Sequence, residues 1–144
     1  MRIRSRGREC ALQMFYQLEL TGLSSKEVYD QFFLEYEEPY PLKEFAFFLL
    51  TGAFERRDML DGCIQRYARN WDLKRMAVID RNILRIAIFE LLYVEDIPAK
   101  VTINEAVELA KRFGDVDSAK FVNGILDSVF RKEQPSAAQI KSPS

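Results

Sequence analysis

Residues 77–94 constrain the fold more than any other stretch of this sequence, because they are apolar nearly all the way round a helix. Their charged and amide side chains are gathered at one end, at Asp80, Arg81, Asn82 and Arg85. A helix without a wide polar face must be buried on several sides at once. We therefore expect a central helix here, surrounded by other helices.

The helical period of apolar residues continues through most of the remaining chain, and glycine or proline stands where helices are expected to end. The other expected helices cover residues 6–20, a segment capped by Ser24 or Ser25, residues 42–69, residues 101–113, and a last segment from a cap at Asp117 or Ser118 to about 132. Within the long helix, we expect Gly52 or Gly62 to mark a bend or a close crossing by another helix. The predicted fold class is all-α.

At 144 residues the chain has the length of one ordinary domain. We expect residues 1–133 to form a single helical domain with a basic arm (1–8), and residues 134–144, poor in apolar residues, to be a disordered tail. No apolar run reaches the roughly 18 residues of a membrane span, and no secretory signal is apparent, so we expect a cytoplasmic protein without a membrane partner. Cys10 and Cys63 lie in separate helical patterns and are predicted to be buried apolar side chains.

The chain contains no histidine, which is the commonest general acid–base residue and a frequent metal ligand. Its six glycines are scattered singly and form no phosphate-binding loop. Glu105 and Glu108 stand near Lys111 and Arg112, which indicates an exposed charged face rather than a catalytic pair. We therefore expect no enzyme activity and no metal or organic cofactor. Glu90, on the apolar central helix, is expected to be held by a structural ion pair.

Four arginines, Arg2, Arg4, Arg6 and Arg8, stand in the first eight residues without any acidic residue, although the chain as a whole has 21 Lys+Arg against 22 Asp+Glu. Arginines that contact phosphates release counterions and add affinity, so this arm predicts a nucleic-acid partner. Alternate residues share one side of an extended chain but not of a helix, and we therefore expect the arm to begin extended. The alternative is a solvated, frayed terminus without a role.

Three separated blocks carry a family resemblance. They are RGRECALQMFY at 6–16, NWDLKRMAVIDRNILRIAIFELLYVEDIPAKVTINEAVELAKRFG at 70–114, and DSAKFVNGILD at 117–127. On these blocks the chain resembles the NusB family of transcription antitermination factors over nearly its whole length. The resemblance implies two small helical bundles packed side by side around a central apolar helix. It also implies binding to boxA RNA of ribosomal RNA transcripts, together with the ribosomal protein NusE, in the RNA polymerase antitermination complex.

The resemblance also assigns roles to individual residues. It implies RNA binding by Arg2, Arg4, Arg6, Arg8, Asp117, Lys120 and Phe121. It also implies docking of NusE on the central helix around Asp80 and Arg81, together with the following helix. Lys120 can neutralise a phosphate, and an exposed aromatic ring can stack an unpaired base. Periodicity alone favours a core position for Phe121, so both interpretations of this side chain stay open.

Single-stranded RNA suits such a protein better than a duplex, because side chains read splayed bases but cannot enter the deep major groove of A-form RNA. Two other functions remain open. One is the detached RNA-binding domain of a ribosomal RNA cytosine methyltransferase. The catalytic domain of such an enzyme does not fit within 144 residues. The other is a helical interaction protein whose basic arm is incidental. Self-association within the family leaves a homodimer open as well.

Overall fold

A computed structural model describes residues 2–143 of the protein; Met1 and Ser144, at the outer ends of the predicted arm and tail, lie outside the described residues. The helices are α1 (Ile3–Thr21), α2 (Ser25–Glu35), α3 (Tyr40–Glu55), α4 (Arg57–Tyr67), α5 (Val78–Tyr93), α6 (Ala99–Phe113) and α7 (Ser118–Lys132), with the 3-10 turn η1 (Leu73–Arg75). Apart from one isolated bridge, residues 2–143 contain no β-structure, and the predicted all-α class is confirmed. None of their helices is long and apolar enough to cross a membrane.

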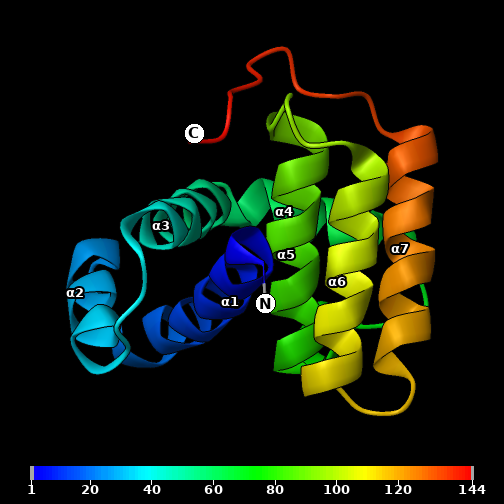
Figure 1. The fold of residues 1–144 in the computed structure, drawn as a ribbon. Coiled ribbons are helices and arrows are strands. Elements are labelled where there is room, and N and C mark those ends of the chain that lie inside the picture. The colour runs from blue at the N-terminus through cyan, green and yellow to red at the C-terminus, as the bar shows by residue number, and fades with distance from the viewer. Residues whose placement is uncertain (1, 144) are drawn as a thin grey trace.

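Helix α5 is the centre of the fold, as predicted (Figure 1). On one side it runs alongside α6 and α7, and α4 packs against both α5 and α7. On the other side α1 and α3 cross each other, and α2 covers their outer end. Two groups of helices therefore lie side by side and share α5, because its apolar residues surround the helix axis.

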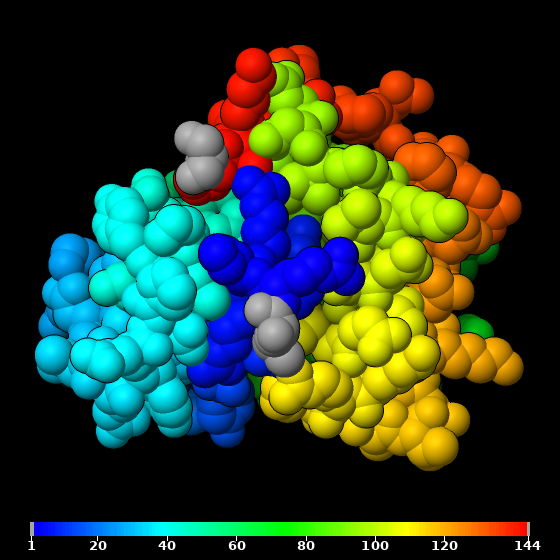
Figure 2. Space-filling model, viewed as in Figure 1, coloured from blue at the N-terminus to red at the C-terminus, as the bar shows by residue number. Residues whose placement is uncertain are grey.

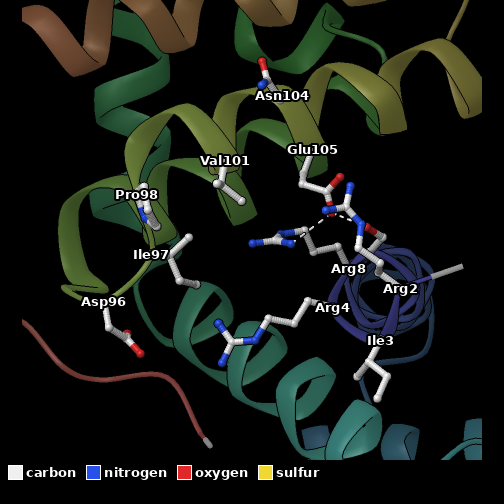
Figure 3. A pocket seen from close by; sticks show the side chains of 11 residues that line it. Arg2, Ile3, Arg4, Arg8, Asp96, Ile97, Pro98, Val101, Asn104 and Glu105 are labelled. Atoms are coloured by element: carbon white, nitrogen blue, oxygen red, sulfur yellow. Dashed lines mark hydrogen bonds and ion pairs between the residues drawn. The ribbon is translucent and has the colours of Figure 1, made fainter.

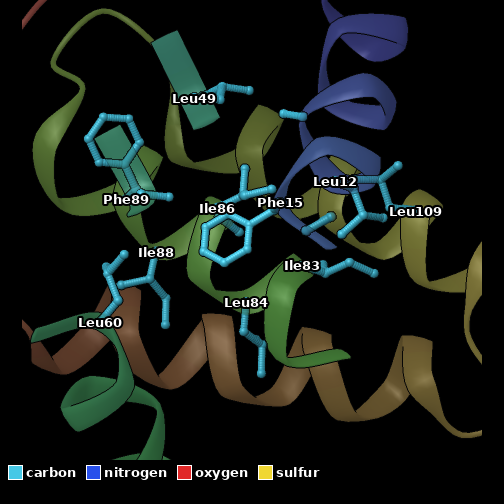
Figure 4. Packing of buried hydrophobic residues seen from close by; sticks show 14 of the residues in the cluster. Leu12, Phe15, Leu49, Leu60, Ile83, Leu84, Ile86, Ile88, Phe89 and Leu109 are labelled. Carbon is cyan, nitrogen blue, oxygen red and sulfur yellow. The ribbon is translucent and has the colours of Figure 1, made fainter. Parts of the chain in front are cut away.

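The core is continuous across the two groups (Figure 4). Ile83, Leu84 and Ile88 of α5 are at most 1% exposed, and they meet Phe15 of α1 and Leu60 of α4 in one cluster. The two cysteines belong to the same core as free thiols, and burial raises the pKa of each to about 11. The predicted burial of both cysteines is confirmed.

Gly52 of α3 allows α5 to approach closely, because a Cβ atom at this position would overlap the ring of Phe89. Phe89 is fully buried at this crossing. A Cβ at Gly62, by contrast, would point into open space. The expected close crossing is therefore at Gly52, and Gly62 serves no comparable packing purpose.

The single long helix predicted for residues 42–69 is wrong, because the chain breaks at Arg56 into α3 and α4. Arg56 leaves the helical region with φ −110° and ψ 20°. Its guanidinium donates to the carbonyl of Gly52 at 3.1 Å and lies 4.8 Å from the ring centre of Tyr93. The apolar period continues across this break, so tertiary contacts rather than the local pattern decide where the helix ends.

The prediction that the arm begins extended is also wrong, because α1 starts at Ile3 and only Arg2, its N-cap residue, is extended. The first turns of α1 lie against the rest of the molecule between α3 and α6, as the space-filling view shows (Figure 2). Gly7, Arg8 and Glu9 are already buried. These contacts make the arm part of the folded domain.

The tail differs from the disorder expected of its composition. It turns back along the end of α5, where Ile140 N–H donates to Tyr93 O at 2.7 Å and the Ile140 carbonyl accepts from Glu95 N–H at 3.0 Å. Ser136 N–H donates to Leu92 O at 2.8 Å. These are backbone hydrogen bonds, which need no apolar sequence pattern. The last described residues reach the start of α1 (Figures 1 and 2).

Helix ends agree with the predicted caps in one case and differ in another. Ser24 caps α2, accepting from Glu27 N–H at 3.1 Å in a capping box. Asp117 occupies the N-cap position of α7 but makes no side-chain cap. The Ser118 hydroxyl instead accepts from Asp115 N–H at 3.0 Å, which fixes the turn before α7.

Candidate nucleic-acid interface

Arg8 is not a free arginine of the arm, because its side chain is buried in ion pairs. Its guanidinium donates to both carboxylate oxygens of Glu90, at 2.7 and 2.9 Å, and to Glu105 at 3.1 Å. Glu90 also accepts from the Thr102 hydroxyl at 2.9 Å, which confirms the predicted structural pairing of Glu90. Burial alone would lower the pKa of Arg8, but the bonds and charges of Glu90 and Glu105 raise it. Arg8 therefore holds α1 to α5 and α6.

Arg6 is partly exposed and has acidic neighbours on two elements. Its guanidinium donates to Glu38, before α3, at 2.9 Å and to Glu9 at 3.1 Å. Burial lowers the pKa of Arg6, and the hydrogen bond and charge of Glu38 outweigh it, so the net shift is upward. A phosphate at Arg6 would have to compete with both carboxylates.

Arg2 and Arg4 differ from Arg6 and Arg8 in forming no ion pair with a carboxylate within residues 2–143. Arg2 is exposed. Arg4 is half-buried, lies 4.5 Å from the ring centre of Phe45, and donates to Ser142 Oγ and Pro143 O, both at 2.9 Å. The Arg4 side chain is thus occupied by the tail.

A pocket of about 500 Å³ opens at these arginines, between the start of α1, the turn after α5 and the side of α6. Figure 3 shows Arg4 pointing toward Asp96 and Ile97, with Arg2 beside Glu105. A second pocket of about 290 Å³ continues along α6 from Arg2 to Arg112. The two pockets share Arg2 and Arg8 in their walls, so the surface that begins at the arm extends down α6.

The α6–α7 turn leads to the second group of predicted residues. Asp117 and Lys120 are exposed, and Phe121 is half-buried. The Phe121 ring meets Trp71 edge-on, with centroids 5.7 Å apart and planes at 66°. Phe121 therefore lies at the edge of the core and presents part of its ring to the surface. This position is intermediate between the core side chain and the exposed stacking ring that the sequence left open.

Trp71 is the surface residue that sequence reasoning missed. It is 52% exposed although it is the largest side chain in the connection between α4 and η1. Together with Phe121, Lys120 and Arg69 it lines a pocket of about 300 Å³. Its partner Phe121 lies far away in the sequence, so the sequence does not show that the two rings pack together. The local signal for Trp71 is a single large aromatic residue within a polar connection.

Asp80 and Arg81, predicted to dock NusE, are largely covered by the protein itself. Asp80 is 7% exposed at the start of α5. Arg81 pairs with Glu19 of α1 at 3.4 Å, next to the buried Arg85, which donates to both oxygens of Asp61 at 2.6 and 2.8 Å. This end of α5 is therefore tied to α1 and α4 through charged side chains.

The comparisons with known proteins assign the family. The model of the NusB family matches residues 5–131. The chain belongs to the NusB family. The NusB antitermination protein of Myxococcus xanthus is 48% identical over 134 residues, covering 90% of this chain and 95% of the relative. That of Syntrophus aciditrophicus is 42% identical, covering 92% and 82%.

Solved NusB structures have the same fold. NusB of T. maritima matches with a TM-score of 0.83 at 39% identity, covering 92% of this chain and 93% of that one. A NusB protein crystallised with NusE and double-stranded RNA matches with a TM-score of 0.81 at 25% identity, covering 91% and 98%. The two-bundle arrangement implied by the resemblance is thus the arrangement of NusB proteins.

Proposed function

We propose that this protein is a transcription antitermination factor that binds boxA-type RNA together with NusE. The observation that carries the proposal is the match along nearly the whole chain to a NusB protein crystallised with NusE and RNA. The curated relatives are antitermination proteins of which the chain covers 82% and 95%, which favours this function over a detached methyltransferase domain.

The RNA-binding surface that we assign begins at Arg2 and Arg4, follows α6, and ends at Asp117, Lys120 and Phe121. Arg2 and Lys120 supply exposed positive charges for phosphates, and the half-buried ring of Phe121 supplies an aromatic contact for a base. Arg6 contributes only after exchanging a carboxylate for a phosphate. Arg8 is left out of the direct contacts, because Glu90 and Glu105 already hold its guanidinium.

We propose that NusE docks at the start of α5, on the side of the helix that carries Arg81 rather than the nearly buried Asp80. Val78, one turn away, is 37% exposed and gives this end of the helix an apolar surface. Glu19 beside Arg81 adds a charged rim. Assembly with RNA polymerase in the cytoplasm follows from the antitermination role. A homodimer that buries Arg2 and Arg4 would mask the same RNA surface.

The test is a titration of labelled boxA-like RNA, single-stranded and as a duplex, with and without NusE. Binding should be tighter with NusE and should favour the single strand. Replacing Arg2 and Arg4 together by alanine should weaken binding and reduce the salt slope by about one to two units, because two phosphate contacts are lost. Lys26→Ala, which removes an exposed cation on α2, away from the proposed surface, is the control.

Unchanged affinity and slope in the double arginine variant would remove the arm from the interface. No RNA binding under any condition would favour the alternative, a helical interaction protein without an RNA role. Sedimentation of the free protein and of its RNA complex would show whether a homodimer forms and whether RNA dissociates it.

A further inference from the structure

Trp71 and Phe121 also line another pocket, on the side of Asp80, which differs from the pocket that they share with Lys120 and Arg69. This Asp80 pocket has the chemistry of a base-recognition site. It has a volume of about 300 Å³ and lies between the connection after α4, the start of α5 and the start of α7. Trp71 and Phe121 form its aromatic wall, and Asp80 lies among its polar residues. Its volume is at the lower end of the range for small-ligand sites, so it suits one planar group.

The carboxylate of Asp80 is the polar group of this pocket that calls for a ligand. Asp80 is 7% exposed, and its Oδ1 atom has no hydrogen-bond partner within the described residues. Removing a carboxylate from water without a donor is unfavourable. Burial raises the pKa of Asp80, and a hydrogen bond from Ser118 lowers it by less, so the net shift is upward. A molecule with N–H groups directed at Oδ1 would supply the missing donor.

The aromatic pair sets how a planar group can enter. Aromatic atoms in contact are about 3.5–4.0 Å apart, so a base inserted between two rings needs about 7 Å between them. The centroids of Trp71 and Phe121 are 5.7 Å apart and their planes are tilted by 66°. A base can therefore stack on the exposed face of Trp71, with Phe121 at its edge, but cannot be sandwiched.

The charges around the aromatic pair separate base from phosphate. On the Asp80 side, Asp115 and Asp117 also line the pocket. With Asp80 they outnumber Arg75, the cation of this lining, so the pocket is net negative and disfavours phosphate. On the other side, the neighbouring pocket shares Trp71 and Phe121 but is lined by Lys120 and Arg69. A nucleotide bridging the two would place its base against Asp80 and its phosphate against these cations.

We propose that this pocket binds one unstacked guanine of the RNA, with the base stacked on Trp71, its N1–H and N2–H groups donating to Asp80, and its phosphate held by Lys120 and Arg69. Guanine is the base that presents two adjacent donors on its Watson–Crick edge, and a carboxylate is the acceptor that matches them. On adenine and cytosine an acceptor nitrogen lies beside the amino group, and it would face the carboxylate unfavourably. Uracil offers a single N–H between two carbonyls.

Because this site rests on the proposed RNA-binding function, the experiment separates the two. The probes are uridine oligoribonucleotides of equal length that carry one central guanosine, inosine, adenosine or uridine. Inosine keeps N1–H but lacks the N2 amino group. Trp71 is the only tryptophan of the chain, so its fluorescence reports directly on stacking.

The full-length protein should bind the guanosine oligonucleotide about 5- to 100-fold more tightly than the adenosine and uridine ones, with inosine between them, since a two-point base contact discriminates by about this factor. Trp71 emission should be quenched most by the guanosine probe. Asp80→Asn should abolish the preference. Asp127→Asn, which removes an exposed carboxylate further along α7, should retain it.

Trp71→Phe should keep the guanosine preference at reduced affinity, and Trp71→Ala should weaken binding of every probe, with thermal melts confirming that each variant is folded. Equal binding of all four probes by the unmodified protein would overturn the guanine site while leaving RNA binding intact. A preference that survives Asp80→Asn, or bound RNA that leaves Trp71 emission unchanged, would overturn it as well. Failure to bind any probe or boxA RNA would overturn both proposals.

Discussion

Arg8 near the start of α1 and Glu90 near the end of α5 form a two-point ion pair in the interior, 82 residues apart in the sequence. Both side chains are nearly inaccessible, at 4% and 1% exposure. The pair joins the two groups of helices and, through Glu105 and Thr102, also reaches α6. The chain thus uses one of its four N-terminal arginines to dock the segment that presents the others.

Removing one member of this pair should be strongly destabilising. Arg8→Ala leaves a buried carboxylate without its partner, and we expect the free energy of unfolding in urea at pH 7 to fall by about 3–5 kcal/mol. Lys26→Ala, which breaks an exposed pair with Asp30, should change it by less than about 1 kcal/mol. Arg8→Met combined with Glu90→Leu should recover much of the loss. Equal effects of Arg8→Ala and Lys26→Ala would contradict a structural role for Arg8.

The two glycines of the segment 42–69 should respond in opposite directions to alanine. At Gly52 the added methyl group overlaps the Phe89 ring, and we expect a loss of about 1–3 kcal/mol in the free energy of unfolding from overpacking. At Gly62 the methyl group enters open space within α4, so the higher helix propensity of alanine should add up to about 1 kcal/mol. Denaturant titration of both variants measures the difference. A neutral Gly52→Ala would show that the α3–α5 crossing can relax.

Helix positions could be predicted from the sequence because the apolar period reports which face of each segment is buried. Glu90 was identifiable for the same reason, as a charge on an apolar helix. The break at Arg56 and the helical start of α1 could not be predicted, because Tyr93, Glu90 and Glu105 lie far away in the sequence and supply the deciding contacts. Lys120 and Phe121 were assigned to the candidate site only through the family resemblance. Trp71 escaped notice because its packing partner is equally remote.

The tail should compete with RNA for Arg4. Removing residues 135–144 deletes the two acceptors of the Arg4 guanidinium, Ser142 Oγ and Pro143 O. Hydrogen bonds of this kind contribute about 0.5–1.5 kcal/mol each, so the loss of two of them should raise RNA affinity by at least about 5-fold. The increase should disappear when Arg4 is also replaced by alanine. If truncation weakens RNA binding, the tail is instead part of the interface.

Acid should release the same tail contact. Burial would raise the pKa of Asp96, but hydrogen bonds from the Ser142 backbone and hydroxyl and the charge of Arg4 lower it below its ordinary value. Because its pKa is lowered in the folded protein, the ionised Asp96 carboxylate stabilises the tail contact. This stabilisation is complete above the ordinary aspartate pKa and is lost as pH falls below about 4. Protection of the Ser142 and Ile140 amides from hydrogen exchange, followed from pH 6 to below pH 3, should show the tail opening only after the pH has fallen below the ordinary aspartate pKa. Asp96→Asn should make this opening independent of pH.

Phe121 and Phe130 provide a matched pair on α7 for testing the stacking surface. Phe121 is half-buried against Trp71, and Phe130 is 57% exposed near the other end of the helix. We expect Phe121→Ala to weaken RNA binding by about 1–3 kcal/mol, the range of a base–aromatic contact, because the base stacked on Trp71 loses the ring at its edge. Its effect on the free energy of unfolding should stay below the roughly 3–5 kcal/mol of a fully buried phenylalanine, because part of the ring already faces water. Phe130→Ala should leave RNA binding unchanged.

Lys120→Ala measures the contribution of the lysine charge to RNA binding separately from that of the neighbouring Phe121 ring. It should weaken RNA binding less than Phe121→Ala, and the difference from the unmodified protein should shrink as salt is added, because a phosphate contact at an exposed lysine is a screened charge interaction. The effect of Phe121→Ala should persist at high salt, since stacking does not depend on counterions. RNA titrations of both variants at two salt concentrations, with thermal melts alongside, measure these effects. A strongly destabilised Phe121→Ala whose folded fraction binds RNA normally would return the ring to the core and leave Trp71 as the sole stacking surface at this end of the molecule.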